Sequence, residues 1–277
     1  MRLVRTIAAA RKAVAQAKRP LGLVPTMGFL HEGHLALVRR ARAENEALAV
    51  SIFVNPTQFG PSEDFADYPR DLERDLDLLR KEKVDFVFAP AAEEVYPAGF
   101  STGVLVEGLT ERLEGEFRPG HFRGVATVVL KLLNILQPDR AYFGQKDAQQ
   151  LRVIRQMVSD LNLPVEVVAV PTVREKDGLA LSSRNVRLSP EARQSATVLS
   201  RALRRAEDLY EAGERSGWVL REAMRSVLAE EPSAKADYVS VADPETLQEL
   251  ETVTSGALLS LAVRIGGVRL IDNLPLP

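Results

Sequence analysis

Short apolar runs alternate with longer helical patterns through the first two-thirds of the chain, and this alternation limits the folds that the chain can adopt. The runs are nearly continuously apolar and rich in β-branched residues, which is typical of strands buried on both faces of a parallel sheet. Polar segments with apolar residues at helical spacing separate them. Expected strands are 21–26, 47–55, 84–90, 141–144 and 164–171, and expected helices are 34–45, 71–83, 125–136 and 147–161. This pattern predicts an α/β domain whose ligands bind beyond the carboxyl ends of its strands.

The pattern changes after Ser189-Pro190, where the serine can cap a helix and the proline fits the first helical turn. Two charged helical patterns and then three short strand-like runs follow. The helices are expected at 190–212 and 217–230, and the strands at 236–241, 257–263 and 268–274. We therefore expect a Rossmann-like parallel-sheet domain at residues 1–185 and a smaller α+β domain at residues 186–277.

Composition excludes several classes of protein. Lys plus Arg total 36 against 38 for Asp plus Glu, and the net charge of -2 predicts no general attraction to nucleic acid or to an anionic membrane. With 0 cysteines, disulfides, thiolate catalysis and cysteine-ligated metals are excluded. No apolar stretch approaches the length of a membrane-spanning helix, so we expect a soluble cytoplasmic protein.

The segment PTMGFLHEGH at 25–34 is the most informative one. Gly28 permits a tight turn after a strand, and His31 and His34 open the next helix. Backbone N–H groups and two imidazoles at one place could stabilise phosphate charge. GxxxxGK[ST] and GxGxxG are absent from the sequence, so a phosphate site here would be built around the histidines. Two alternatives stay open: a metal site on this histidine pair, or histidines that only cap the helix.

Four further polar segments carry candidate residues, although each could also be an ordinary surface turn. The third histidine, His121, lies beside Arg118 in EGEFRPGHFRG, so all three histidines are expected in glycine-bearing loops. Asn55 and Gln58 follow a strand in FVNPTQF, where amides can bind hydroxyl groups. Lys146 in FGQKDAQQ suits a phosphate. The hydroxyls and guanidinium of SSR at 182–184 suit a polyphosphate, and PSEDFADYPR at 61–70 resembles a rim loop.

The whole chain resembles the pantoate–β-alanine ligases, a family of the HIGH-motif nucleotidylyltransferase superfamily. The resemblance rests on six blocks that occur in the family's order and spacing. These are PTMGFLHEGH, FVNPTQF, EDFADYPR, RPGHFRGVATVV, FGQKDAQQ and REKDGLALSSRN. One departure is that LALSSRN lacks the first lysine of the related KMSKS loop, and Lys146 could supply that charge instead.

The resemblance implies an ATP-dependent condensation of (R)-pantoate with β-alanine through a pantoyl adenylate, which releases AMP and pyrophosphate. Mg²⁺ would enter with ATP, since magnesium rarely has an all-protein cage. No metal ligand is assigned, and Asp75 is one candidate. The resemblance further implies a homodimer, small-molecule substrates without nucleic acid or membrane, and closure of the smaller domain as a lid.

Individual roles are also implied by the resemblance. His31, His34 and Lys146 are the expected catalytic residues. Expected ATP-binding residues are Met27, His34, Gly144, Lys146, Asp147, Val173, Ser182, Ser183 and Arg184. Expected pantoate-binding residues are Met27, Asn55, Gln58 and Gln150, and Tyr68, Glu114 and Arg118 are expected at the rim near the second substrate.

Overall fold

The structure is a computed structural model that describes residues 1–60 and 65–277. It divides the chain into two compact units. Unit 1 comprises Met1–Thr110, Arg118–Gln145 and Gln150–Pro171, and unit 2 comprises Glu111–Phe117, Lys146–Gln149 and Thr172–Pro277. From Thr172 onward all residues belong to unit 2. The domains expected at 1–185 and 186–277 stay a prediction. The rim loop expected at 61–70 lies outside the described residues at 61–64.

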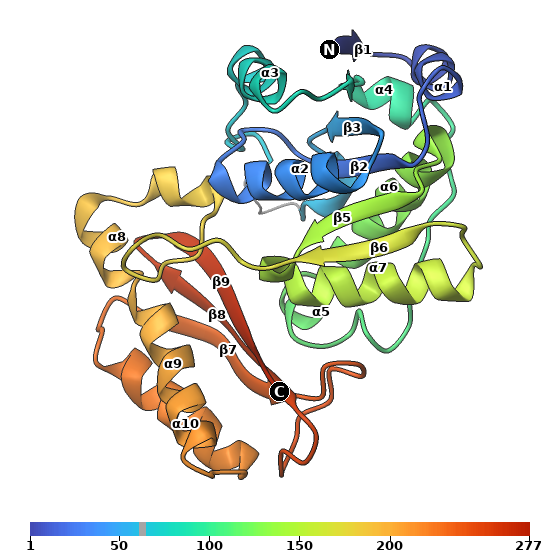
Figure 1. Ribbon diagram of the computed structural model, residues 1–277. Coiled ribbons are helices and arrows are strands. Elements are labelled where there is room, and N and C mark those ends of the chain that lie inside the picture. Colours follow the sequence, from blue (N-terminus) through green and yellow to red (C-terminus); the bar gives the residue numbers. More distant parts are fainter. Residues whose placement is uncertain (61–64) are drawn as a thin grey trace. The chain divides into compact units, whose positions relative to one another are not determined.

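Within the described residues, unit 1 is built on a six-stranded, entirely parallel sheet with the order β1-β4-β3-β2-β5-β6 (Figure 1). The strands are β1 (Arg2–Val4), β2 (Leu21–Thr26), β3 (Ala47–Ile52), β4 (Phe86–Phe88), β5 (Arg140–Gly144) and β6 (Glu166–Val170). The predicted parallel α/β fold is confirmed, and the sequence pattern missed only the short edge strand β1.

The strand order reverses beside β2. From β2 the chain builds β3 and β4 outward on one side, and it then returns to place β5 against the other side of β2. Such a switch point separates the loops that follow two neighbouring strands and is where ligands bind in open α/β sheets. The loops after β2 and β5 contain the segments that the sequence singled out at 25–34 and 143–150.

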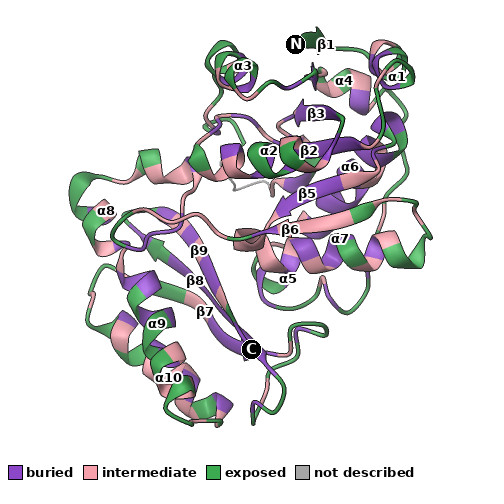
Figure 2. Ribbon diagram, in the orientation of Figure 1, coloured by how far each residue is buried: buried purple, intermediate pink, exposed green. Residues whose placement is uncertain are grey.

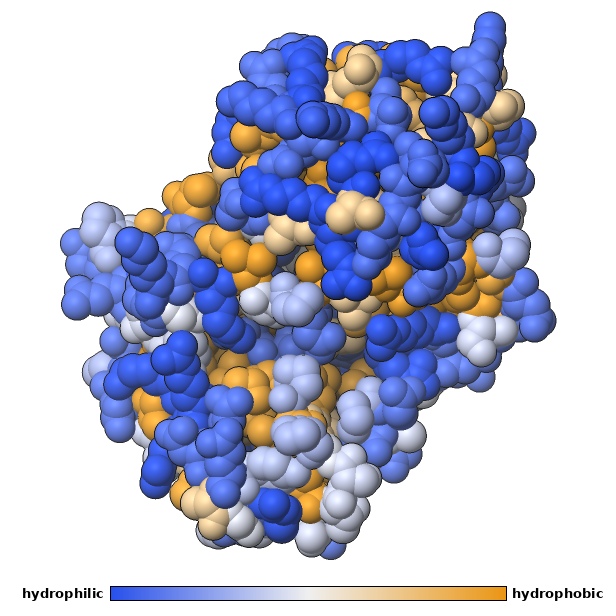
Figure 3. Space-filling model, viewed as in Figure 1, coloured by the Kyte–Doolittle hydropathy of each residue, from blue (hydrophilic) through white to orange (hydrophobic). Residues whose placement is uncertain are grey.

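Helices cover this sheet. They are α1 (Ile7–Ala15), α2 (Glu32–Glu44), α3 (Leu72–Lys81), α4 (Ala92–Val95), α6 (His121–Leu136) and α7 (Ala148–Asp160), the last of which begins in unit 2. Helix α2 packs on β2, β3 and β5. Figure 2 shows β2, β3 and β5 mostly buried and the edge strands β1 and β6 more exposed, and Figure 3 shows hydrophilic side chains over most of the face on which α2 and α7 lie. Helices α2 and α7 therefore bury one apolar side each, as their spacing predicted.

Two histidines lie inside helices, so the expectation that all three occupy loops is wrong. Helix α2 starts at Glu32 because the His31 side chain accepts from the Gly33 N–H at 3.2 Å and so acts as an N-cap. Helix α6 starts at His121, four residues earlier than expected, after Gly120 in the left-handed conformation with φ 81°. Neither cap is Ser, Thr, Asp or Asn, the residue types that usually indicate a helix start.

Unit 2 contains, among the described residues, the antiparallel sheet β7-β8-β9. Its strands are β7 (Lys235–Ala242), β8 (Ala257–Ile265) and β9 (Val268–Leu276). Its helices are α5 (Glu114–Phe117), α8 (Pro190–Ser195), α9 (Val198–Glu211) and α10 (Gly217–Ala229). Ser189 caps α8 as predicted, with its Oγ accepting from the Ala192 N–H at 3.2 Å. The single helix expected at 190–212 is divided because the N–H and hydroxyl of Thr197 both donate to the Gln194 carbonyl, which tightens the turn.

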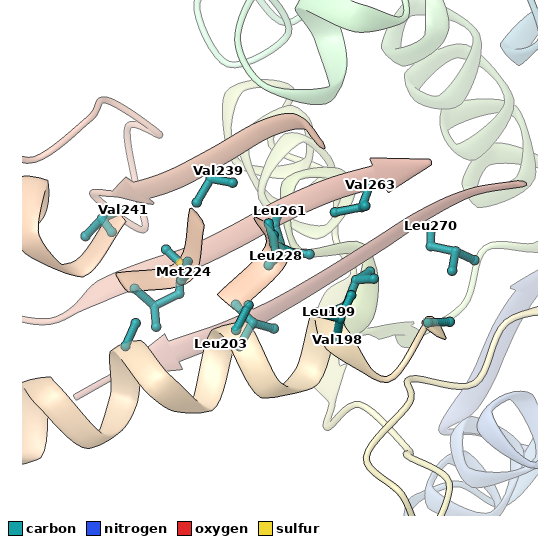
Figure 4. Close-up of a cluster of buried hydrophobic side chains, with 14 of the residues drawn as sticks. Val198, Leu199, Leu203, Met224, Leu228, Val239, Val241, Leu261, Val263 and Leu270 are labelled. Atoms are coloured by element: carbon teal, nitrogen blue, oxygen red, sulfur yellow. The ribbon is translucent and has the colours of Figure 1, made fainter. Parts of the chain in front are cut away.

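The core of unit 2 lies between this sheet and the helices α9 and α10 (Figure 4). Leu203 of α9 and Met224 of α10 point toward Val241 of β7 and Leu261 of β8, and all four are buried. Each such side chain stabilises the folded state by about 1.5–3 kcal/mol relative to exposure. Among the described residues, no helix combines the length and hydropathy that a membrane span requires.

Tyr142 connects β5 to the end of α2 and makes a testable contribution to stability. The Tyr142 side chain is 0% exposed, and its hydroxyl accepts from Asn45 Nδ2 at 2.7 Å and donates to Glu44 Oε2 at 2.9 Å. Burial, together with the hydrogen bond to the Glu44 carboxylate, raises the pKa of Tyr142 from 10.0 to about 12.

We expect Tyr142→Phe to lower the free energy of unfolding at pH 7 by about 1–3 kcal/mol, because Asn45 and Glu44 lose a partner. Because the folded pKa is the higher one, the unfolded tyrosine ionises first. The advantage of Tyr142 should therefore be complete below pH 10 and decline as the pH rises from 10 toward 12. Urea unfolding across that range measures both effects.

The control Tyr210→Phe removes an exposed hydrogen bond to the Pro277 carbonyl and should change stability by less than about 1 kcal/mol. Equal pH profiles for wild type and Tyr142→Phe would contradict this account.

Candidate active site

The site in unit 1 begins where β2 ends. The Thr26 hydroxyl donates to the Ser51 carbonyl of β3 at 2.8 Å and accepts from the Gly28 N–H at 3.2 Å. The chain then turns through two residues of positive φ, Gly28 at 83° and Phe29 at 51°. This conformation suits a glycine and is uncommon for an aromatic residue, so surrounding groups must hold it.

His31 and His34 lie side by side after this turn. Their ring centroids are 4.0 Å apart, with 40° between the ring planes. Nδ1 of His31 accepts from the Gly33 N–H at 3.2 Å, and Nδ1 of His34 accepts from the His31 N–H at 3.3 Å. Because Nδ1 accepts in both rings, this network assigns the neutral tautomer with the proton on Nε2. Each ring therefore carries an Nε2–H donor, which is the group that a phosphate oxygen requires.

Backbone donors of the same loop bind the protein itself. The N–H groups of Phe29 and Leu30 donate to the carboxylate of Asp75 on α3, both at 2.7 Å, and the Gly33 N–H donates to His31. These three N–H groups therefore already have acceptors within the protein, and the expectation that backbone groups of this segment serve a phosphate stays a prediction. Burial raises the pKa of Asp75, and its bonds to Leu30 and Phe29 oppose that rise.

A cluster of amides lies after β3. Asn55 is 1% exposed, and its Nδ2 donates to Gln58 Oε1 and to the Gly124 carbonyl, both at 3.1 Å. Its Oδ1 accepts from the hydroxyls of Tyr96 at 2.8 Å and Thr57 at 2.9 Å. Asn55 thus binds groups of unit 1 through both its donors and its acceptor, and it orients the Gln58 side chain.

Gln58 contacts several of the candidate residues of unit 1. Its Nε2 lies 3.2 Å from Met27 Sδ, which joins the loop after β2 to the short helix η1 (Pro56–Gln58). The main-chain carbonyl of Gln58 accepts from His121 Nδ1 at 2.8 Å, and Arg118 Nη1 lies 3.1 Å from the Nε2 of that histidine. His121 therefore donates through Nδ1 and accepts through Nε2 as a neutral ring, in a structural role that holds η1.

The other predicted residues of unit 1 take less central places. Gly144 ends β5, and Gln150 lies in the first turn of α7. Tyr68 is 5% exposed and packs edge-on against Phe59, with the ring centroids 5.8 Å apart. Gly144 is the last residue of a strand adjacent to β2, so it lies at the carboxyl end of the sheet.

The remaining predicted residues belong to unit 2. Lys146 Nζ lies 3.5 Å from Asp147 Oδ1, and the Lys146 carbonyl accepts from Asn273 Nδ2 of β9 at 2.7 Å. Ser182 Oγ accepts from the Arg184 N–H at 3.3 Å and caps the short helix η3 (Ser183–Arg187).

Val173 and Glu114 are held by partners within unit 2. The Val173 carbonyl accepts from the Leu181 N–H at 3.0 Å, and Ser183 is buried. Both oxygens of Glu114 accept from Arg269, at 2.6 and 2.7 Å, so this buried carboxylate is part of a partly buried ion pair. Its expected place at the rim near a second substrate stays a prediction.

Sequence reasoning missed the residues that hold the candidate residues in place. Asp75, Tyr96, Asn273 and Arg269 contact partners that are 41 to 155 residues away in the chain. No local pattern reports such pairs. Asp75 had one visible signal, because it is a carboxylate on the apolar side of an amphipathic helix, between Leu72 and Leu76. Among the described residues, no group of three or more His, Asp or Glu side chains is arranged to hold a metal ion.

A parallel sheet with a switch point beside β2, and a histidine pair beyond that strand, place the chain in the class of open α/β proteins, whose ligands generally bind at the strand ends. The family model described as pantoate–β-alanine ligase matches residues 2–275. The chain belongs to the pantoate–β-alanine ligase family.

Curated relatives and solved structures agree with that match. The pantothenate synthetase of Chloroflexus aggregans is 67% identical over 99% of this chain and 99% of that protein. The structure of pantothenate synthetase from Thermus thermophilus is 55% identical, with a TM-score of 0.95 and 99% of both chains covered. A third solved structure is that of the pantoate–β-alanine ligase from Francisella tularensis in complex with β-γ ATP and β-alanine. Its sequence is 35% identical to this chain, and the two structures match with a TM-score of 0.82 over 99% of this chain and 97% of that one.

Gly124 of α6 offers a test of how η1 is held. A Cβ at this position would meet the Thr57 carbonyl oxygen at 2.3 Å and Gln58 Cα at 2.7 Å, both backbone atoms. We expect Gly124→Ala to lower the free energy of unfolding by about 1–3 kcal/mol, because η1 must move to admit the methyl group. Urea unfolding measures this. The control Asn134→Ala lies at an exposed position of the same helix and should not destabilise the protein. A Gly124→Ala protein as stable as wild type would contradict the close packing of η1 on α6.

Proposed function

We propose that this chain condenses (R)-pantoate with β-alanine and cleaves ATP to AMP and pyrophosphate. The observation that carries the proposal is the family match over residues 2–275 together with full-length relatives named pantothenate synthetase. The Francisella tularensis relative, crystallised with an ATP compound and β-alanine, supports the assignment of two of the substrates.

In the first step, a carboxylate oxygen of pantoate attacks the α-phosphorus of ATP, and the bond from that phosphorus to pyrophosphate breaks. Negative charge grows on the α-phosphoryl oxygens and on the leaving group, so positioned donors and cations supply most of the catalysis. His31 and His34 are the proposed donors, through the Nε2–H groups that their Nδ1 contacts imply. In unit 2, Lys146 is the proposed point charge on the phosphates.

The other ATP contacts are proposed from the resemblance and agree with the chemistry of the side chains. Ser182, Ser183 and Arg184 combine hydroxyl and guanidinium donors, which suit the β- and γ-phosphates. The remaining proposed contacts to ATP are made by Met27, Gly144, Asp147 and Val173.

In the second step, the amine of β-alanine attacks the carbonyl carbon of the pantoyl adenylate, AMP leaves, and the amine loses a proton as the amide forms. The pantoate half is proposed to lie against Gln58 and Gln150, whose amides suit its hydroxyls, with Met27 and Asn55 beside it. The contacts of Gln58 with Asn55 and Met27 support a preset orientation of that amide. Tyr68, Glu114 and Arg118 are proposed at the rim.

Mg²⁺ is proposed as part of the ATP substrate. The ion would bridge phosphate oxygens and neutralise part of their charge, with water as its other ligands. Asp75 is not proposed as a ligand, because both of its oxygens already accept backbone N–H groups. A homodimer and a cytoplasmic location are proposed on the resemblance alone, and a solution mass of two chains would support the former.

The decisive experiment first omits β-alanine and then adds it. With ATP, Mg²⁺ and pantoate but no β-alanine, we expect one equivalent of pyrophosphate per active site and an acyl adenylate that stays bound. Addition of β-alanine should then release AMP and pantothenate in equal amounts, which chromatography of the quenched reaction measures. A product that retains the nucleotide would indicate an adenylyltransferase instead, and continuous AMP release without β-alanine would also contradict the proposal.

His34→Ala tests the histidine pair. We expect turnover to fall about 10²-fold or more, whereas the affinity for ATP falls much less, because a positioned donor acts chiefly in the transition state. Single-turnover rates and equilibrium binding separate the two effects. The control Glu32→Ala lies in the same turn at an exposed position and should retain activity. Full turnover of His34→Ala would remove this histidine from the mechanism.

A further inference from the structure

We propose that Asp75 is a positioning residue that holds the loop 28–30 and thereby places the imidazoles of His31 and His34. The activity part of this inference rests on the proposed function, whereas the placement of the rings can be measured without it. Asp75 lies on α3, 46 residues along the chain from Phe29, and none of the six sequence blocks of the family resemblance includes it.

The Asp75 carboxylate is bound at both oxygens. Oδ2 accepts from the Phe29 N–H and Oδ1 from the Leu30 N–H, each at 2.7 Å. The side chain is 1% exposed, so water does not replace these bonds. Two consecutive N–H groups in a turn form a concave pair of donors that suits an anion. In this protein the anion is a side chain of α3.

The loop has a backbone conformation that needs external support. Gly28 and Phe29 both have positive φ, at 83° and 51°, and the second is unfavourable for a bulky residue. A Cβ on Gly28 would lie 3.0 Å from Asp75 Oδ2, so the loop lies directly on the carboxylate. The contact with Asp75 therefore offsets a conformation that a free loop would populate rarely.

Arg74, the residue before Asp75, holds the other side of the loop. Its Nη1 donates to the Leu30 carbonyl at 3.0 Å, and its guanidinium carbon lies 5.3 Å from the centre of the Phe29 ring. Adjacent residues of one helix thus bind two N–H groups, one carbonyl and one ring of the loop. This fixes the loop in both position and direction relative to α3.

His31 directly follows the last residue of the loop, Leu30, so the loop and the histidine pair are joined without a linker. Leu30 is 0% exposed, and the next residue, His31, caps α2 through its own ring. His34 is then tied to His31, because its Nδ1 accepts from the His31 N–H. A displacement of Leu30 therefore moves both rings, and donors that are misplaced by about 1 Å lose much of their catalytic effect.

The test is Asp75→Asn, which keeps the shape of the side chain but replaces one acceptor oxygen by an NH₂ group. That group would face a backbone N–H, so only one of the two bonds can survive. We expect turnover to fall about 10- to 100-fold while the KM for ATP changes less than about threefold. The ring signals of His31 and His34 in an NMR spectrum should shift, whereas that of His121, the third of only three histidines, should not.

Two further variants keep the test decisive. Asp71→Asn makes the same substitution one turn earlier, at the residue that precedes α3, where the carboxylate caps the helix by accepting from the Arg74 N–H at 3.1 Å. It should leave turnover and the ring signals unchanged, because asparagine is also a good N-cap. Arg74→Met removes the bond to Leu30 from a side chain that is 47% exposed, so this variant is expected to fold. Arg74→Met should shift the ring signals of His31 and His34 and lower turnover, but by less than Asp75→Asn does. If Asp75→Asn does not fold, Arg74→Met is the variant that tests the proposal.

The proposal is overturned if Asp75→Asn, or Arg74→Met in its place, lowers the melting temperature but leaves turnover and the two ring signals as in wild type. Asp75 would then only stabilise the fold. A wild-type protein without ligase activity would contradict the proposed function instead, and the ring signals would still decide whether Asp75 places the histidines.

Discussion

Parallel strands that are buried on both faces leave little room for polar chemistry except at their ends. In unit 1, β2 and β3 are almost completely buried along their length, and hydrophobic side chains of α2 and α3 pack with them in one core. The loops beyond β2 and β3 carry the histidine pair and the Asn55–Gln58 amides. Because β2 lies at the switch point of the sheet, these polar groups collect around its carboxyl end.

Such a site must also satisfy its own backbone. The loop after β2 turns sharply, and its N–H groups need acceptors because they are removed from water. Asp75 supplies two of these acceptors, and the His31 ring supplies a third. The same side chains that satisfy the backbone therefore determine where the imidazoles lie, so that local stability and catalytic geometry depend on the same few hydrogen bonds.

Comparable support occurs in unit 2. The Lys146 carbonyl is held by Asn273 of β9, and Glu114 is held by Arg269 of the same strand. The next residue to Asn273, Asp272, is 2% exposed and paired with Arg174 at 2.6 Å. Residues of β9 thus hold segments that lie far earlier in the chain, and among them is the segment of Lys146, a candidate phosphate ligand.

Much of the fold could be predicted from local pattern. The strands at 21–26 and 141–144 and the helix at 147–161 are found within one residue of their expected bounds, since each has strong periodicity or clear ends. The strand expected at 47–55 ends at Ile52, because Asn55-Pro56 begins η1 instead. Helix starts at Glu32 and His121 were misplaced because histidine and glycine took the capping positions that serine or aspartate usually fill.

The fold class, the family resemblance and the candidate residues could all be predicted from the amino-acid sequence, because strand periodicity and the six motif blocks are local properties of the chain. Which groups hold those residues follows from tertiary contacts. Whether the N–H groups of Phe29 and Leu30 are open to a ligand depends on Asp75, and whether Gln58 is oriented depends on Asn55, Tyr96 and Gly124. Hydrogen bonds between residues that are tens of positions apart exist only once the sheet has brought its loops together, so no local pattern encodes them.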